Sequence, residues 1–542
     1  MSKGLKITLG FIVVAITGVA AYVFLVFKGS SGHLALVPKN AGFVGVVDFK
    51  SLASKLDMEK VKNLKVWKYL EEQKKKSDKK EPMGEVLKDP ASSGLDPFSK
   101  LCFFAVAEKE NDFSGGVVAH LLSASGFEET IKKAEIKSPI EDKGSYKSVK
   151  IESGLLIAWN KESALVFGSQ DTVNIAKTCE TLMNQKKDES ILANEDFQKL
   201  NEKAFDMAAF VNYEGITKLV EKGAASNPMY NKGSMDALKG SSMYGTLNFE
   251  EKRVAVEIES TIKDKEAFEK INYFAANGLS KDHIKTISPD KVYALMAFSV
   301  DFKKFLASMS ANTMVAEVIN SLKMRFGLND AELQNLLTGE ISLALIDFDA
   351  IIHPEPAPLT ASLNPADPMA AYANPPQPKL PSLSLSASVG DKKAAEKVIA
   401  ALGLPKNEEG YYTVPTGFLN VYMVETPKGF TFTNGKNIAS QLYSQKGFKE
   451  VAEPVKSMVT ANPTTVYFDL NISHYPKELL EMFKMLNGEE AYAKFNNIMK
   501  NFESLSAKGS SFKSSSELLF TPGEGNSLMR LILISDELVP KP

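Results

Sequence analysis

Cysteine and histidine are scarce in this sequence. Among 542 residues the only cysteines are Cys102 and Cys179, and neither belongs to a metal-binding or redox spacing. Cys102 stands in an apolar run and is expected to be a buried thiol, although one disulfide between the two stays open. The histidines have no short metal-ligand spacing; they are His33, His120, His283, His353 and His474. We therefore predict no metal and no cofactor.

The sequence also has no excess of basic over acidic residues. The chain has 64 basic and 66 acidic residues and a formal net charge of −2. Proteins that bind duplexes neutralise phosphates with clustered lysine and arginine, and this balance offers no such clusters overall. Nucleic acid is therefore not expected as a partner.

Catalytic motifs are absent too. The sequence has no zincin helix, Walker loop, dinucleotide glycine pattern, nucleophile elbow or calcium loop. Asp347 and Asp349 lie two apart at a strand end, but one such pair supplies too few ligands for a cation. His120, on an apolar strand, is interpreted as a core histidine. No catalytic residue is predicted, and an enzyme is not the favoured class.

One long apolar run stands at the N-terminus. Ile7–Phe27 contains no charge and is flanked by Lys3, Lys6 and Lys28. As a helix it would be about 31 Å long, enough to cross the hydrocarbon core of a bilayer. The lysines before the run keep the short tail inside. Residues 1–28 are therefore predicted to be a cytoplasmic tail and membrane anchor, with the body in the periplasm or extracytoplasmic space.

A cleaved signal peptide is the alternative for the same run. Val19 and Ala21 fit the small-residue positions of a cleavage site. The run continues past them to Phe27, which a released signal peptide does not need. We therefore predict a single-pass protein of the bacterial inner membrane that is held by Ile7–Phe27.

Four short polar residues follow apolar, strand-like runs. A carboxylate or amide at such a place can accept the free amide protons that begin the next helix. These residues are Asp48, Asp301, Asn212 and Asp469. Capping explains both their position and their type, so their predicted role is structural.

The pattern around Asp48 recurs later in the chain. Val47–Lys50 returns as Val300–Lys303, and the later strands and helices follow in the same order about 255 residues apart. The sequence therefore predicts an internal duplication, with a first α+β repeat at 29–284 and a second at 285–542.

The strands mostly alternate polar and apolar residues, as at Thr246–Phe249 and Ser384–Ala387. Alternation and short connections are typical of antiparallel sheets with helices packed on one face. The expected fold class is α+β: an N-terminal single transmembrane helix, then a duplicated unit of antiparallel sheets with packed helices.

A proline-rich loop is predicted at 352–381, because nine prolines in that range cannot pair in a sheet. A bare linker is one interpretation. The other is a segment that docks a partner in a polyproline conformation, with apolar contacts from Leu359, Met369 and Tyr372.

The opening motif also carries a resemblance. Val37–Ala41 before the first strand and Val47–Leu52 at its end resemble a family of uncharacterised envelope proteins of Bacteroidota, classed as a domain of unknown function. Members are often lipoproteins, whereas this chain has no lipid-accepting cysteine near Ile7–Phe27. The resemblance implies neither an activity nor catalytic residues.

These observations favour a membrane-anchored extracytoplasmic binding or scaffold protein of the bacterial cell envelope, with a protein partner there. Two alternatives stay open. An envelope hydrolase with an unrecognised active site would show carboxylates clustered in a concave pocket. A carrier of an apolar ligand would show a large apolar cavity. The sequence does not indicate the oligomeric state.

Overall fold

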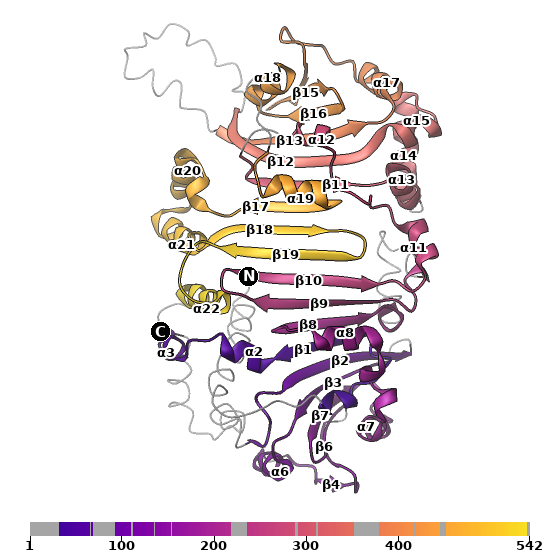
Figure 1. Ribbon diagram of the computed structural model, residues 1–542, viewed down its shortest axis with the longest axis vertical. Helices are drawn as coiled ribbons and strands as arrows, with labels where there is room; N and C mark the ends of the chain where they lie inside the picture. The colour runs from indigo at the N-terminus through magenta and orange to yellow at the C-terminus, as the bar shows by residue number, and fades with distance from the viewer. Residues whose placement is uncertain are drawn as a thin grey trace. The chain divides into compact units, whose positions relative to one another are not determined.

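The computed structural model (Figure 1) describes residues 32–65, 67–68, 93–109, 112–134, 136–152, 154–217, 236–287, 291–310, 313–351, 379–416, 419–444 and 451–538. The chain divides into two units. The first is Met1–Phe268 with Pro522–Pro542, and the second is Glu269–Thr521. These units are defined by contacts in the structure, whereas the repeats were defined by a recurring sequence pattern. The repeat bounds 29–284 and 285–542 therefore stay a prediction.

The first unit is built on antiparallel strands. Those described are β1 (Phe43–Asp48), β2 (Lys100–Lys109), β3 (Asp112–His120), β4 (Glu141–Asp142), β5 (Lys147–Glu152), β6 (Leu155–Trp159), β7 (Ser163–Ser169), β8 (Met207–Asn212), β9 (Ser242–Phe249) and β10 (Arg253–Thr261). They pair in the order β10-β9-β8-β1-β2-β3-β7-β6-β5-β4.

The core of the first unit lies on one face of this sheet. Successive residues of a strand point to opposite faces, so Val44, Val46 and Phe104 share the buried face. Its described helical segments are η1 (Gly32–Leu36), α2 (Phe49–Ser54), α3 (Met58–Lys62), α6 (Ala124–Lys133), α7 (Ile175–Asn184), η3 (Lys187–Glu189), η4 (Ile191–Ala193), α8 (Glu195–Glu202), α11 (Lys265–Ile271, which runs past the end of the unit) and α22 (Ser527–Leu538). Among these, η1, α7 and α8 cover the buried face.

The second unit has the same strand order. Its described strands are β11 (Ala294–Ser299), β12 (Leu337–Ile351), β13 (Lys379–Val389), β14 (Tyr412–Pro415), β15 (Asn420–Thr426), β16 (Gly429–Thr433), β17 (Thr464–Asp469), β18 (Phe502–Gly509) and β19 (Lys513–Phe520). They pair as β19-β18-β17-β11-β12-β13-β16-β15-β14, all antiparallel. Strand by strand, this matches the first unit from β10 to β5.

Helices again cover one face of the second sheet. The described ones are α12 (Lys281–Ile284), α13 (Phe302–Ser310), α14 (Thr313–Phe326), α15 (Asp330–Asn335), α17 (Lys392–Leu402), α18 (Lys436–Ser444), α19 (Val455–Ala461), η5 (Ile472–His474), α20 (Lys477–Asn487) and α21 (Glu489–Met499). α12, α18 and α19 pack against the strands, and Figure 1 shows α18 and α19 in front of them. Leu295, Val424 and Leu442 lie in the core between these layers.

The predicted fold class is wrong in its transmembrane helix. Within the described residues, no helix is long and apolar enough to cross a membrane. The longest of these, α14, has 14 residues and is about 21 Å long, short of the roughly 30 Å of hydrocarbon. Ile7–Phe27, on which the prediction rested, and residues 352–378 of the proline-rich loop lie outside the described residues. The antiparallel sheets with packed helices are present.

Candidate functional site

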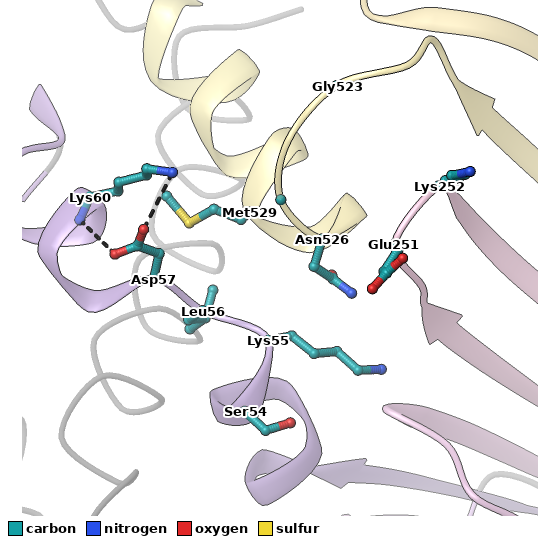
Figure 2. Close-up of a pocket in the computed structure, with 11 residues that line it drawn as sticks. Ser54, Lys55, Leu56, Asp57, Lys60, Glu251, Lys252, Gly523, Asn526 and Met529 are labelled. Carbon is teal, nitrogen blue, oxygen red and sulfur yellow. Dashed lines mark hydrogen bonds and ion pairs between the residues drawn. The ribbon is translucent and has the colours of Figure 1, made fainter.

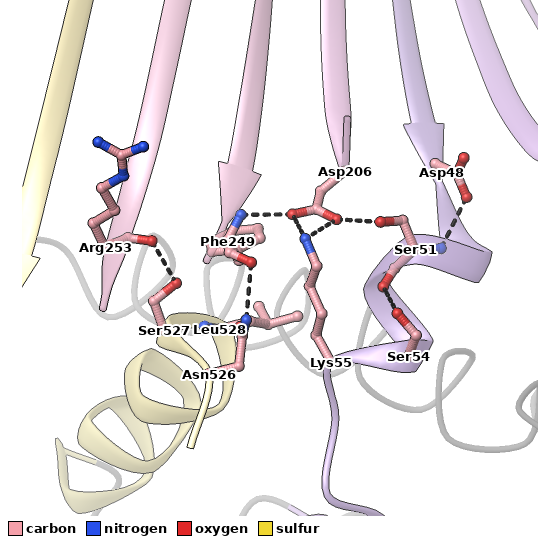
Figure 3. Close-up of polar contacts among 10 residues, drawn as sticks. All are labelled: Asp48, Ser51, Ser54, Lys55, Asp206, Phe249, Arg253, Asn526, Ser527 and Leu528. Atoms are coloured by element: carbon pink, nitrogen blue, oxygen red, sulfur yellow. Dashed lines mark hydrogen bonds and ion pairs between the residues drawn. The ribbon is translucent and has the colours of Figure 1, made fainter. Parts of the chain in front are cut away.

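A buried carboxylate organises one end of the first unit (Figure 3). Asp206, directly before β8, is fully buried. It accepts hydrogen bonds from Lys55 Nζ at 2.5 and 2.6 Å, from Ser51 Oγ at 2.6 Å and from the Phe249 backbone N–H at 2.6 Å. Both oxygens are thus satisfied, as a buried charge requires.

The sequence after β1 places two of these donors. Asp48 is the N-cap of α2, because its Oδ1 accepts the Ser51 backbone N–H at 2.9 Å. The cap starts a short helix, in which residues four apart share one face. Ser51 and Lys55 therefore reach the same carboxylate.

A pocket of about 580 Å³ opens beside Lys55 (Figure 2). It is lined by Ser54–Asp57 and Lys60, by Glu251 and Lys252 in the turn between β9 and β10, and by Gly523, Gly525, Asn526 and Met529 at the start of α22. Figure 2 shows the pair of Asp57 and Lys60, 3.4 Å apart, on one side and Glu251 with Lys252 on the other.

Charged side chains of both signs line this pocket, together with the apolar Leu56 and Met529. Three lysines and two carboxylates are among these residues, so the lining favours neither a simple anion nor a simple cation strongly. No serine, cysteine or threonine lies beside a histidine base in its lining, which is the pairing that nucleophilic catalysis needs. In the described part of the chain, no group of three or more metal-ligating side chains occurs.

The residues predicted to cap helices follow neighbouring antiparallel strands in each unit, so they lie at opposite ends of those strands and do not converge. Asp301 Oδ1 accepts the Lys304 N–H at 3.0 Å, and Asn212 Oδ1 accepts the Glu214 N–H at 3.1 Å. Asp469 Oδ1 accepts the Asn471 N–H at 3.0 Å, and its Oδ2 lies 2.8 Å from His474 Nδ1. The N-cap of the following helix, η5, is Asn471 and not Asp469. The predicted contact residues Leu359, Met369 and Tyr372 lie outside the described residues.

The second sheet exposes an apolar surface that the sequence did not reveal. Its most exposed members are 38–45% accessible; they are Met296, Leu343, Leu383, Leu385, Phe468 and Leu505. The register places them on one face, since Met296 faces Leu343, and Leu343 faces Leu385 on the next strand. These six define the apolar sheet face of the second unit.

The opposite face of the same strands is buried, and on β12, β13 and β16 it carries serine and threonine beside the apolar core residues Ala344 and Ile346. Ser342 faces Ser386, which in turn faces Thr431, and all three are at most 2% exposed. His283 of α12 lies over them, with Nδ1 2.7 Å from Ser388 Oγ and Nε2 2.9 Å from Ser342 Oγ. Burial lowers the pKa of His283 to about 4. At these positions serine and threonine are buried while leucines are exposed, which is the reverse of the usual alternation.

The first unit also has an exposed apolar face. Phe103, Phe113, Val117 and Val166 are its exposed members, and they define the apolar sheet face of the first unit. Gly45 lies opposite Phe103, and a Cβ at Gly45 would come 2.2 Å from the phenylalanine ring. A side chain at Gly45 would therefore displace the ring, which lies across β1 on this face.

The fold and these surfaces define an α+β protein whose antiparallel sheets each carry helices on one face and exposed apolar side chains on the other. Residues 34–528 match the family model described as Domain of unknown function (DUF4836), and the chain belongs to this family. A comparison with curated proteins finds no match.

Two solved structures show a weak likeness. Crystal forms III and I of TP0453 are 10% and 11% identical to this chain, with TM-scores of 0.26 and 0.25. Each match covers 44% of this chain, and 82% and 81% of the other. Scores this low support no inference about this protein.

Proposed function

We propose that this chain is a binding or scaffold protein of the bacterial cell envelope, and that it docks a protein partner through its apolar sheet faces. The observation that carries the proposal is the row of large apolar side chains, 38–45% exposed, on the second sheet. The resemblance of Val37–Ala41 and Val47–Leu52 supports a finer placement among Bacteroidota envelope proteins, whose members are often lipoproteins.

Physical chemistry favours a protein as the occupant. Removing apolar surface from water stabilises a complex by about 25 cal/mol per Å², and monomeric proteins rarely expose large contiguous apolar patches. A small apolar ligand needs a concave site that surrounds it. The six residues of the second face spread over β11, β12, β13, β17 and β18, which is the kind of extended surface another protein can cover.

The second candidate function is binding of a small amphiphilic ligand, at a site other than the apolar sheet faces. A pocket of about 320 Å³ lies between α7 and the first sheet. Phe104, Phe167 and Leu182 form its apolar wall, and Thr178 and Gln185 line its polar part. Its volume is at the lower end of the range of ligand pockets, about 300–1,000 Å³.

The hydrolase hypothesis gains no support from the described residues. His120 pairs with Asp96 at 3.0 Å, and the Ser99 hydroxyl beside them donates to the Asp96 backbone carbonyl, not to the His120 ring. His283 does contact two serines, but all three side chains are buried and line neither of the two pockets.

Leu385→Glu tests the docking surface. The glutamate points to solvent from an exposed position, so we expect folding to be retained, with a change in the free energy of unfolding within about 1 kcal/mol. It places a charge in the proposed interface, where desolvation is costly, so partner recovery should fall at least tenfold. The measurement is affinity purification after cross-linking in intact cells, with urea unfolding in parallel.

Leu402→Glu is the matched control. Leu402 is 37% exposed in the same unit but lies on α17 and not on the sheet. Partner recovery should be unchanged in this variant. Equal recovery with Leu385→Glu and the unmodified chain would contradict the proposal.

A further inference from the structure

His33 has a buried ring nitrogen that makes no hydrogen bond within the described residues. The side chain lies in η1, is fully buried, and its Nε2 is 2.5 Å from the Lys100 carbonyl oxygen. A neutral imidazole has one N–H, which Nε2 donates to that carbonyl. The Nδ1 lone pair then has no hydrogen-bond partner among the described residues. Such a group is costly when buried, and an ion or a water molecule is the usual explanation.

His120, whose ring lies near that of His33, also has a ring nitrogen with a free lone pair. Its Nδ1 lies 3.0 Å from Asp96 Oδ2, and Asp96 is itself held by the Phe98 N–H on Oδ1. Nδ1 therefore donates to the carboxylate, and the lone pair of His120 stays on Nε2. Each ring thus has one nitrogen fixed by an acceptor, a carbonyl for His33 and a carboxylate for His120. Metal-ligating histidines are usually held in this way.

The two rings are close enough to share an ion. Their centroids are 6.1 Å apart and their planes meet at 53°. A metal 2.0–2.1 Å from an imidazole nitrogen lies about 3 Å from the ring centre. We propose that His33 Nδ1 and His120 Nε2 bind one divalent transition-metal ion of the class that imidazole prefers, Zn²⁺ or Cu²⁺.

The surroundings fit this site. Burial lowers the pKa of His33 to about 4, so the ring is neutral and able to bind a metal at pH 7. Lys100 does not compete, because its ammonium group donates to Asn201 Oδ1 at 3.0 Å and lies over the Phe205 ring. The His120 side chain is 15% exposed, so solvent can supply the remaining ligands. Two protein ligands predict modest affinity.

The test is a titration of the full-length protein, without a histidine tag and stripped of metal, with Zn²⁺ against a chromophoric chelator. We expect one equivalent to bind. His33→Gln and His120→Gln should each weaken binding at least tenfold, because each removes one ligand. Asp96→Asn should weaken it about tenfold by loosening the His120 ring.

The chain supplies two matched controls. His474 also pairs with a carboxylate, Asp469, but the described part of the chain places no second histidine against its ring. His283 is buried, but both its nitrogens are bonded to serines. His474→Gln and His283→Gln should bind Zn²⁺ as the unmodified chain does. No binding, or an equal loss in His474→Gln, overturns the proposal.

A second measurement does not depend on the variants folding. In a crystal of the unmodified protein grown with Zn²⁺, anomalous diffraction at the zinc edge should place the ion between His33 and His120. A water molecule at that position, with the zinc peak elsewhere, overturns the proposal.

Discussion

Lys55→Met is expected to lower the free energy of unfolding of the first unit by about 3–5 kcal/mol. Asp206 is fully buried, and within the described residues Lys55 is its only cationic partner. Removing the ammonium group leaves a buried charge with hydrogen bonds from Ser51 and Phe249 alone. Both tryptophans of the chain, Trp67 and Trp159, belong to this unit, so the tryptophan fluorescence signal during urea unfolding comes from this unit.

Two further variants make that test specific. Lys60→Met removes the exposed pair with Asp57 and should leave the urea midpoint almost unchanged, because exposed pairs contribute little. Combining Lys55→Met with Asp206→Asn removes both charges and should recover part of the loss. If Lys55→Met and Lys60→Met behave alike, the Asp206 cluster does not stabilise the unit.

Acid is expected to destabilise the second unit by about 3 kcal/mol between pH 7 and pH 4, through His283. The pKa of this ring is about 4 in the fold, against 6.5 when unfolded. In that window the unfolded chain binds a proton that the folded chain does not, so stability rises with pH and is lost as pH falls below 6.5. The stabilisation is fully present above pH 6.5.

His283→Gln should flatten this part of the pH profile, since glutamine does not titrate. The readout is hydrogen exchange of β12 and β13 peptides in urea, corrected for the intrinsic exchange rate at each pH. His33→Gln lies in the other unit and should leave the profile of these peptides unchanged. A profile of His283→Gln as steep as that of the unmodified chain would refute the assignment.

Apolar runs and capping residues in the sequence predicted much of the secondary structure. The apolar runs Leu101–Val106 and Ile341–Ile346 lie within β2 and β12, and Asp48 accepts the N–H that begins α2. Strand periodicity and helix capping depend on neighbouring residues, so a single sequence contains their signals.

The sequence did not indicate which face of each strand is buried. The polar and apolar residues Ser384, Leu385 and Ser386 alternate in the same way whether the serines or the leucine face the core. The choice is made by α12, α18 and α19, which are far away in the sequence and cover the serine side. Hydrophobic burial alone would have placed the leucines inside.

The Asp206 cluster was missed for a related reason. Asp206 is a single aspartate in the sequence, and Lys55, its ionic partner, is 151 residues away. The C-terminal helix α22 likewise packs Leu528 and Ile532 against Leu52 and Val61 near the start of the chain. A single sequence carries no local signal for contacts of this range.

The most direct test of docking through the apolar sheet faces is site-specific photo-cross-linking in living cells. A photoreactive residue replaces Leu343 or Leu383 on the second face, Val117 on the first, or Leu402 on α17 as the control. We predict one discrete protein adduct, identical from Leu343 and Leu383, absent from Leu402 and abolished by Leu385→Glu. No adduct from the sheet positions, or the same adducts from Leu402, would contradict the account.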